Sequence, residues 1–239
     1  MNPLETLLTH AATIEAKLGY QFKNRSFLLL AFIHRSFVNE HKAITDHNER
    51  LEFLGDAVLG MLVSDFLYQR MPNTAEGDLS FLRSRLVEAS SCVGYVQSLD
   101  IYRYMLLGKG ERYNEGRGKE TILSDLFEAI IGAIFLDGGL EAARNFLFNN
   151  FESQIQATLE TPLRNWKAAL QDLCQKRFQQ APVYSVLDES GPDHVKQFSI
   201  AVMIGTHELG RGTGASKKEA QQAAAANALS KELGMKANG

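Results

Sequence analysis

Cysteine, proline and tryptophan are scarce in this sequence. Its 239 residues include two cysteines, five prolines and one tryptophan. Cys92 and Cys174 lie far apart, and neither belongs to a CxxC pair, so the sequence indicates neither a zinc framework nor a disulfide. Two reduced, buried thiols in a cytoplasmic protein are the simpler interpretation.

Long apolar runs and a basic amino-terminus are lacking as well. The longest uninterrupted apolar stretches, such as Ala129 to Leu136, are far too short to span a bilayer. Met1 to Leu8 contains Glu5 and no basic cluster, which is unlike a secretory signal. We therefore expect a cytoplasmic protein with no membrane partner.

An excess of positive charge is absent from the chain as a whole. The formal net charge is −3, which taken alone argues against a nucleic acid as partner. Residues 1–160, however, hold 15 basic and 21 acidic side chains, whereas residues 161–239 hold 10 and 7. The charge changes sign at Thr161-Pro162, and proline disfavours helix in the residue before it. We expect a boundary between two parts there.

Residues 1–160 have the pattern of helices. Apolar residues recur at helical spacing in two long segments: Leu54, Val58, Leu59 and Leu62, and then Leu123, Phe127, Ile130, Ile131 and Ile134. Turn signals separate the runs: Met71-Pro72-Asn73, Leu107-Gly108-Lys109-Gly110 and Asp137-Gly138-Gly139. No convincing strand-like alternation occurs, so we expect an all-α first domain.

Residues 164–234 have a different pattern. Alternating segments rich in β-formers predict three short strands, at Val183–Leu187, Val195–Ile204 and Thr206–Gly210. Helices are expected on either side, at Trp166–Phe178 and Ser216–Leu233, the second with Ser216 as N-cap and Gly234 as its stop. The glycine-rich segment from Gly210 to Gly214 is expected to be a turn. The order α-β-β-β-α predicts a small α+β domain with two helices on one sheet face.

Acidic residues are concentrated in one of the predicted helices. Glu49, Glu52 and Asp56 are spaced i, i+3 and i+7, so they share one face. Asp46 or Asn48 could cap this helix, and Asp46 with Glu49 has the spacing of a capping box. Carboxylates stacked on one face repel each other unless a cation lies among them.

A second acidic pair lies on a strongly apolar helix. Asp125 and Glu128 are spaced i and i+3 there, and acids on a central helix are rarely buried without a partner. Either acidic group alone is equally well explained as a solvated face. Together with Glu52 and Asp56, however, the pair would form an oxygen-rich cage suited to Mg²⁺ or Mn²⁺. Glu76, near a turn, is a third acidic candidate, for which plain exposure is the ordinary expectation.

Two features of the basic part could bind an anion. Ser216-Lys217-Lys218 opens the last helix, where free backbone N–H groups and the helix dipole favour phosphate. The alternative is two solvated lysines, which the dipole disfavours in a first turn. The loop that contains His194 lies between the first two predicted strands and could reach a groove; taken alone it is only a turn.

The sequence that contains these residues resembles the bacterial ribonuclease III family over nearly its whole length. The resemblance is carried by His34-Arg35-Ser36, by the segment from Asn48 to Leu59 (NERLEFLGDAVL), by Glu76-Gly77-Asp78-Leu79-Ser80, by Asp125 and by Glu128-Ala129. The carboxyl-terminal part resembles a double-stranded-RNA-binding domain through Gly191-Pro192-Asp193-His194, Gly212-Thr213-Gly214 and Ser216-Lys217-Lys218-Glu219-Ala220.

The resemblance implies a division of labour. Residues 1–160 would be an all-α endonuclease domain, and residues 164–234 an RNA-binding domain. The implied roles are as follows: metal ligands Glu52, Asp56, Asp125 and Glu128, of which Asp56 and Glu128 are catalytic; secondary acids Glu49 and Glu76; RNA-binding residues Gln171, His194, Ser216, Lys217 and Lys218.

The implied reaction is Mg²⁺-dependent hydrolysis of phosphodiesters in double-stranded RNA, with Mn²⁺ a possible substitute. The family forms homodimers, leaves 5′-phosphate and 3′-hydroxyl ends, and processes ribosomal RNA precursors and some messenger and transfer RNA transcripts. Two alternatives stay open. One is a non-catalytic RNA-binding protein with a degenerate nuclease fold, although all four acids are present. The other is a structural or ribosome-associated dimer, which would need no metal.

Overall fold

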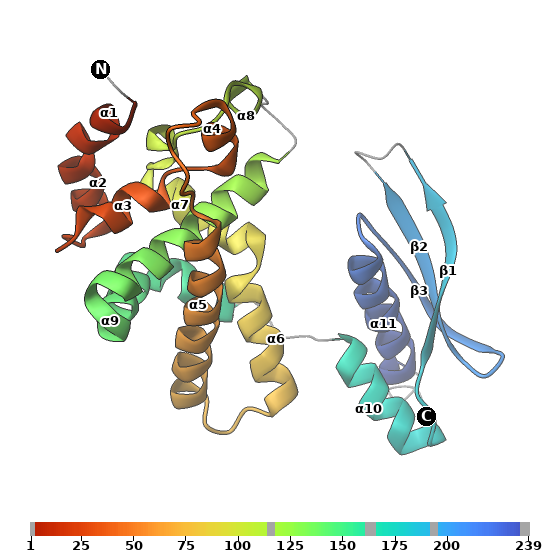
Figure 1. Cartoon of the computed structure of the whole chain (residues 1–239). Coiled ribbons are helices and arrows are strands. Elements are labelled where there is room, and N and C mark those ends of the chain that lie inside the picture. The colour runs from red at the N-terminus through yellow and green to blue at the C-terminus, as the bar shows by residue number, and fades with distance from the viewer. Residues whose placement is uncertain (1–2, 114–117, 161–165, 192–195, 235–239) are drawn as a thin grey trace. The chain divides into compact units, whose positions relative to one another are not determined.

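The computed structural model describes residues 3–113, 118–160, 166–191 and 196–234. The chain forms two compact units, Met1–Thr161 and Pro162–Gly239 (Figure 1). The division falls at the dipeptide where the charge changes sign. None of the described helices has the length and apolar character needed to cross a membrane.

The first unit is helical, which confirms the predicted fold class. Its helices are α1 (Pro3–Thr9), α2 (Ala11–Leu18), α3 (Arg25–Ala31), α4 (Arg35–Glu40), α5 (Glu49–Arg70), α6 (Glu76–Val87), α7 (Ala89–Leu99), α8 (Lys109–Tyr113) and α9 (Lys119–Glu160), with a short 3₁₀ helix η1 (Tyr102–Tyr104). In the described part of this unit, β-type pairing is limited to one isolated bridge, Ile33 to Leu106. Helices α5 and α9 pack together at the centre (Figure 1).

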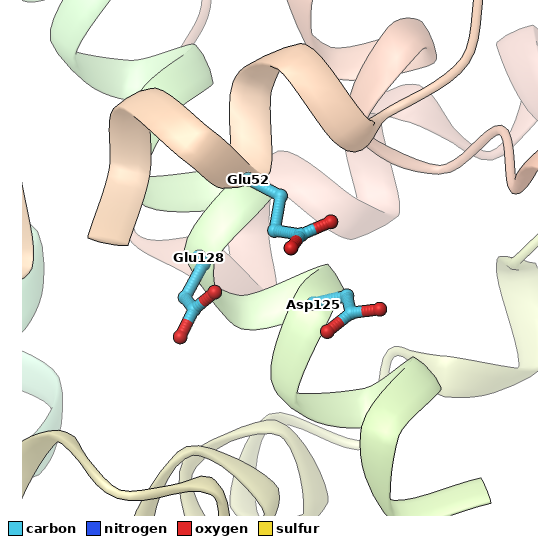
Figure 2. Close-up of side chains that lie close together, drawn as sticks. All are labelled: Glu52, Asp125 and Glu128. Atoms are coloured by element: carbon cyan, nitrogen blue, oxygen red, sulfur yellow. The ribbon is translucent and has the colours of Figure 1, made fainter. Parts of the chain in front are cut away.

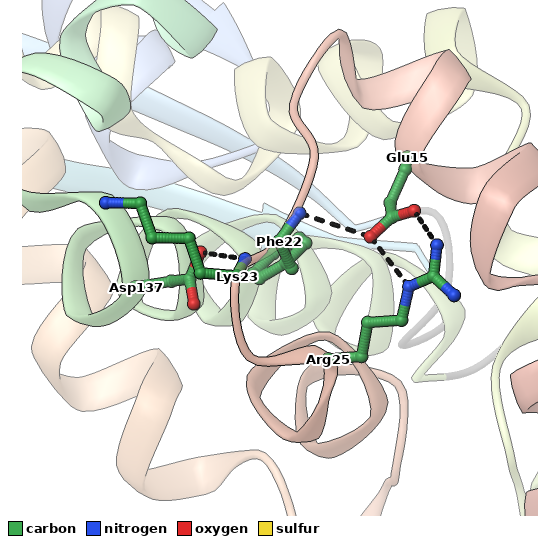
Figure 3. A network of polar contacts seen from close by, with 5 residues as sticks. All are labelled: Glu15, Phe22, Lys23, Arg25 and Asp137. Carbon is green, nitrogen blue, oxygen red and sulfur yellow. Dashed lines mark hydrogen bonds and ion pairs between the residues drawn. The ribbon is translucent and has the colours of Figure 1, made fainter.

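Helix α9 is bent within the predicted Asp137-Gly138-Gly139 turn. Gly139 has φ 80° and ψ −176°, a backbone conformation that L-residues rarely adopt, so the helix axis changes direction there. Asp137, just before the bend, accepts a hydrogen bond from the backbone N–H of Lys23 at 2.8 Å (Figure 3). It accepts another from the backbone N–H of Asn24, also at 2.8 Å. The bend is therefore fastened to the segment that joins α2 to α3.

A second polar contact stabilises the same segment. The buried Glu15 of α2 accepts hydrogen bonds from the backbone N–H of Phe22, at 3.1 Å, and from the guanidinium of Arg25, at 3.1 and 2.6 Å (Figure 3). One carboxylate thus satisfies both a main-chain donor and a charged side chain at the turn into α3.

The second unit has the predicted α-β-β-β-α order. Its elements are α10 (Trp166–Phe178), β1 (Val183–Ser190), β2 (Gln197–Ile204), β3 (His207–Gly214) and α11 (Lys217–Gly234). The strands form an antiparallel sheet in the order β1-β2-β3. Leu170 and Cys174 of α10, Ile200 and Val202 of β2 and the alanines of α11 form its core. Cys92, in the first unit, and Cys174 are both buried, as expected.

The expected turn at Gly210–Gly214 is wrong, because this segment is the second half of β3. A Cβ atom at Gly210 would lie 2.6 Å from the backbone nitrogen of Ala228, and one at Gly212 would overlap the nitrogen of Ala224. The glycines are therefore needed because α11 lies directly against the strand. Their function is close packing rather than chain reversal.

Candidate metal centre and nucleic-acid interface

The site in the first unit depends on how closely α5 and α9 cross. A Cβ atom at Gly55 would overlap the carbonyl oxygen of Glu128, and one at Gly132 would overlap that of Leu51. The two helices therefore touch backbone to backbone, and only glycine fits at the crossing. Side chains one turn away on each helix are brought to the same place.

Three carboxylates meet beside this crossing. Glu52 extends from α5, and Asp125 and Glu128 extend from α9 (Figure 2). One oxygen from each lies within 4.8 Å of the others, and all three residues are partly buried. Within the described part of the chain, no lysine or arginine forms an ion pair with them. We call Glu52, Asp125 and Glu128 the acidic cluster.

Burial and mutual repulsion disfavour the charged form of this cluster. The pKa of Glu128 is raised to about 8, first by burial and then by the charges of Asp56, Asp125 and Glu52. Burial also raises the pKa values of Glu52 and Asp125, with further contributions from neighbouring carboxylates. A divalent cation would relieve this repulsion, and a donor set made only of carboxylate oxygens fits a hard ion such as Mg²⁺ or Mn²⁺.

The other two candidate acids of α5, Asp56 and Glu49, lie at the border of the acidic cluster. Asp56 is exposed and is not among the three residues that meet within 4.8 Å, although its charge raises the pKa of Glu128. Glu49 forms an ion pair with Arg35 at 3.1 Å and lies 3.8 Å from Nδ1 of His47. Its carboxylate contributes to the raised pKa of Asp125.

The start of α5 differs from the predicted capping box. Asn48 occupies the N-cap position, but its side chain makes no capping hydrogen bond, and Asp46 lies outside the helix start. Glu49 is engaged by Arg35 and His47 instead of reaching back to a cap. Arg35 and His47 are the neighbours of the site that spacing did not reveal, because both lie in segments before the helix.

Glu76 lies apart from the cluster. It is the first residue of α6, is exposed, and accepts a hydrogen bond from the hydroxyl of Ser80 at 2.7 Å.

The basic end of the second unit has the predicted N-cap. The Oγ of Ser216 accepts a hydrogen bond from the N–H of Glu219 at 3.2 Å, and the Glu219 carboxylate accepts one from the N–H of Ala215 at 2.9 Å. The side chains of Lys217 and Lys218 are exposed at the first turn of α11, and Gln171 is exposed on α10. His194 lies outside the described residues.

Two family descriptions match the chain, one for each unit. "Ribonuclease-III-like" matches residues 24–155, and "double-stranded RNA binding motif" matches residues 166–232. The Ribonuclease 3 of Protochlamydia amoebophila is 68% identical over 231 residues, which cover 97% of this chain and 96% of that protein. The chain belongs to the ribonuclease III family. It is an endonuclease, and its second unit is a double-stranded-RNA-binding motif.

Other ribonuclease III proteins show the same similarity. The Ribonuclease 3 of Streptococcus gordonii is 42% identical over 97% of this chain and 98% of its own length. Two structures of the ribonuclease III nuclease domain from Campylobacter jejuni cover 58% and 60% of this chain and 96% and 94% of their own chains. Their sequence identities are 41% and 40%, with TM-scores of 0.53 and 0.55.

Gly55 and Gly132 are the residues whose importance sequence reasoning missed. Gly55 was noted only as a letter of a family motif and Gly132 was not singled out, yet the two glycines set the distance between the two helices that carry the cluster. A signal was present, because glycine inside a helix is costly and often indicates a close approach of another backbone.

Proposed function

We propose that this ribonuclease III family member hydrolyses double-stranded RNA with Mg²⁺ as cofactor and leaves 5′-phosphate and 3′-hydroxyl ends. The observation that carries the proposal is the partly buried acidic cluster with no cationic side chain paired to it among the described residues. Mn²⁺ has the same preference for oxygen and would be a substitute.

The chain's own residues would divide the work at this site. Glu52, Asp125 and Glu128 would hold the ion, and Asp56, whose charge raises the pKa of Glu128, would act on the ion or on the attacking water. When bound, Mg²⁺ polarises the phosphoryl oxygen and lowers the pKa of water. Glu128 and Asp56 are proposed as the catalytic residues, with Glu49 and Glu76 as secondary acids that lie further out.

Residues 1–160 are proposed to cut and residues 164–234 to hold the RNA. Double-stranded RNA is recognised by shape, phosphates and 2′-hydroxyls over about 16 base pairs. Exposed Gln171, Lys217 and Lys218 support this assignment, together with Ser216 at the helix start; His194 is proposed from the family motif alone. Little sequence preference is expected.

A homodimer is proposed from an exposed apolar stripe on α5. Phe53 is 81% exposed, Met61 48% and Tyr68 75%, an unusual exposure for large side chains of one helix. One of the Campylobacter structures was described for flexibility in a region involved in dimer formation in that protein. Two copies would supply one active site for each RNA strand. Processing of ribosomal, messenger and transfer RNA precursors in the cytoplasm is proposed from the family resemblance.

Cleavage of long double-stranded RNA by the full chain tests the reaction. Products with 5′-phosphate ends are expected with Mg²⁺ and none with a chelator. Glu128→Gln should lower cleavage at least a hundredfold and leave RNA binding within about twofold, because it removes a proposed metal ligand of the first unit, whereas the proposed RNA-binding lysines belong to the second unit. Glu141→Gln, a matched change at an exposed position of α9, should cut normally. Cleavage in chelator, or by Glu128→Gln, would contradict the proposal; binding without any cleavage would favour a non-catalytic protein.

A further inference from the structure

One carboxylate on the sheet of the second unit lies close to two lysines. Glu189 is the next-to-last residue of β1. Its Oε1 lies 3.0 Å from Nζ of Lys196, and its Oε2 lies 3.9 Å from Nζ of Lys217. The register explains this meeting, since Phe198 of β2 pairs with Glu189 on one side and with Gly214 at the end of β3 on the other. Helix α11 begins directly after that row of residues.

The two lysines that open α11 are therefore not equivalent. The Nζ of Lys217 lies 5.5 Å from the ring centroid of Phe198 as well as near Glu189. Lys218 is exposed and forms no ion pair with any residue that the structure describes. Lys217 has an anionic neighbour within the unit, whereas Lys218 has none among the described residues.

The contact between Lys217 and Glu189 is too weak to hold the lysine in place. A separation of 3.9 Å exceeds hydrogen-bond length, and the side chains are 59% and 40% exposed. Solvated pairs of this kind contribute little to stability. The Nζ of Lys217 also lies over the Phe198 ring, a contact that does not involve the carboxylate. What Glu189 supplies is a negative charge at the point where an anion would bind.

We infer that Glu189 sets the affinity of this unit for double-stranded RNA by occupying Lys217 in competition with a phosphate oxygen. The inference rests on the proposed RNA-binding role. A phosphate that approaches Lys217 must either displace the carboxylate or lie beside it, and both lower the affinity. Lys196 holds the pKa of Glu189 below its usual range, which keeps the competing carboxylate charged at neutral pH.

The test measures RNA binding by variants of the full chain in which one glutamate is replaced by an uncharged residue. A chelator is present, so that the RNA is bound and not cut. Glu189→Gln should bind a duplex longer than about 16 base pairs about two- to fivefold more tightly, the range expected for removing one exposed charge contact. Its advantage should shrink as salt rises, since the effect is electrostatic. In a Lys217→Ala background, Glu189→Gln should give less than half of that gain.

Glu208→Gln is the matched control. Glu208 is also an ion-paired glutamate of the sheet, 2.8 Å from Arg211, but it pairs with Met203 toward the opposite end of β2. Its neutralisation should leave binding within about 1.5-fold. Glu189→Ala should behave as Glu189→Gln does, which separates loss of charge from an effect of the new amide.

The outcomes distinguish this inference from the function on which it rests. If the unaltered chain binds the duplex and Glu189→Gln binds equally or more weakly, the inference is overturned and the RNA-binding role stands. An equal gain from Glu208→Gln would also overturn it, because the effect would then be one of net charge. If the unaltered chain fails to bind double-stranded RNA, the proposed function falls and this inference with it.

Discussion

Glu15 and Glu128 are both carboxylates that folding removes largely from water, yet their pKa values move in opposite directions. The pKa of Glu15 is lowered, chiefly by the hydrogen bond from Arg25. The pKa of Glu128 is raised to about 8, because burial and three neighbouring carboxylates act on it and no cationic side chain among the described residues pairs with it. The first residue has its ionic partner within the fold, and the second belongs to the cluster proposed to bind a metal ion.

Glu15→Gln should remove the ionic part of the contact with Arg25. We expect a loss of about 1–2 kcal/mol in the free energy of unfolding at pH 7, since Arg25 is partly exposed. Because the folded pKa of Glu15 is lowered, its contribution is complete above the unfolded value of about 4.3 and is lost as pH falls through the folded value. The difference between the variant and the unaltered chain should therefore be constant from pH 7 to about 5 and shrink below about pH 4.

Denaturant unfolding across this pH range measures the effect. Glu152→Gln, at an exposed position of α9, is the control and should match the unaltered chain. If the difference in the free energy of unfolding between Glu15→Gln and the unaltered chain grew as the pH fell, it would contradict a lowered pKa of Glu15.

At the residue scale, the three acids that meet could be predicted, whereas Asp56 was expected among them and is not in the group, and the neighbours of the acids could not be predicted. Helical spacing and the family motif named Glu52, Asp125 and Glu128 before their meeting was visible. Arg35 is a different case, because its pairing with Glu49 joins two segments whose relative position depends on tertiary packing. Local periodicity carries no information about such a contact.

At the scale of elements, the crossing of α5 and α9 determines whether the acidic cluster exists. Gly55→Ala would force the helices apart, because the new methyl group overlaps the carbonyl of Glu128. We expect a loss of about 1–3 kcal/mol or more in stability. Mg²⁺ should then no longer raise the thermal unfolding temperature, since the ligands are separated.

Gly94→Ala is the matched control for this prediction. Gly94 lies inside α7, and a Cβ atom there would meet nothing within 4 Å. This variant should be as stable as the unaltered chain or gain up to about 1 kcal/mol, because alanine favours helix over glycine. Thermal unfolding with and without Mg²⁺ distinguishes the two variants, and a Gly55→Ala protein with normal stabilisation by Mg²⁺ would contradict the role of the crossing.

Sequence reasoning found the elements of the second unit but misjudged where β3 ends. The strand continues through Gly210, Gly212 and Gly214, residues that usually indicate turns. Their partners are the alanines of α11, and small residues on both surfaces allow the helix to lie against the strand. Composition showed both sets of small residues, but only the three-dimensional structure shows that they face each other.

At the scale of the whole molecule, the uneven distribution of charge agrees with two tasks. The acidic first part contains the cluster proposed to bind metal, and the basic second part contains the lysines proposed to bind phosphate. The net charge of −3 is the sum of −6 in the first part and +3 in the second, and taken alone it was misleading for that reason. The change of sign at Thr161-Pro162 was visible in the sequence because net charge does not depend on folding.

Association is also a property of the whole molecule, and Phe53→Ser tests the proposed dimer. In a two-fold dimer the change occurs twice, so we expect a loss of about 2 kcal/mol or more in dimerisation free energy. Sedimentation equilibrium should show monomers at concentrations where the unaltered chain is dimeric. Leu187→Ser, at another exposed apolar residue, 49% exposed on β1, should leave the dimer intact. Unchanged association of Phe53→Ser would remove α5 from the proposed interface.

The dependence of the acidic cluster on two distant helices has a consequence for synthesis. Helix α5 leaves the ribosome long before α9, and domains fold as they emerge. Until Asp125 and Glu128 have been made, the growing chain carries Glu52 without the other two proposed ligands, and the proposed metal site cannot form. The proposed activity therefore requires that α9 be complete, so a nascent chain is expected to be unable to cut RNA, including the double-stranded segments of the ribosome that makes it.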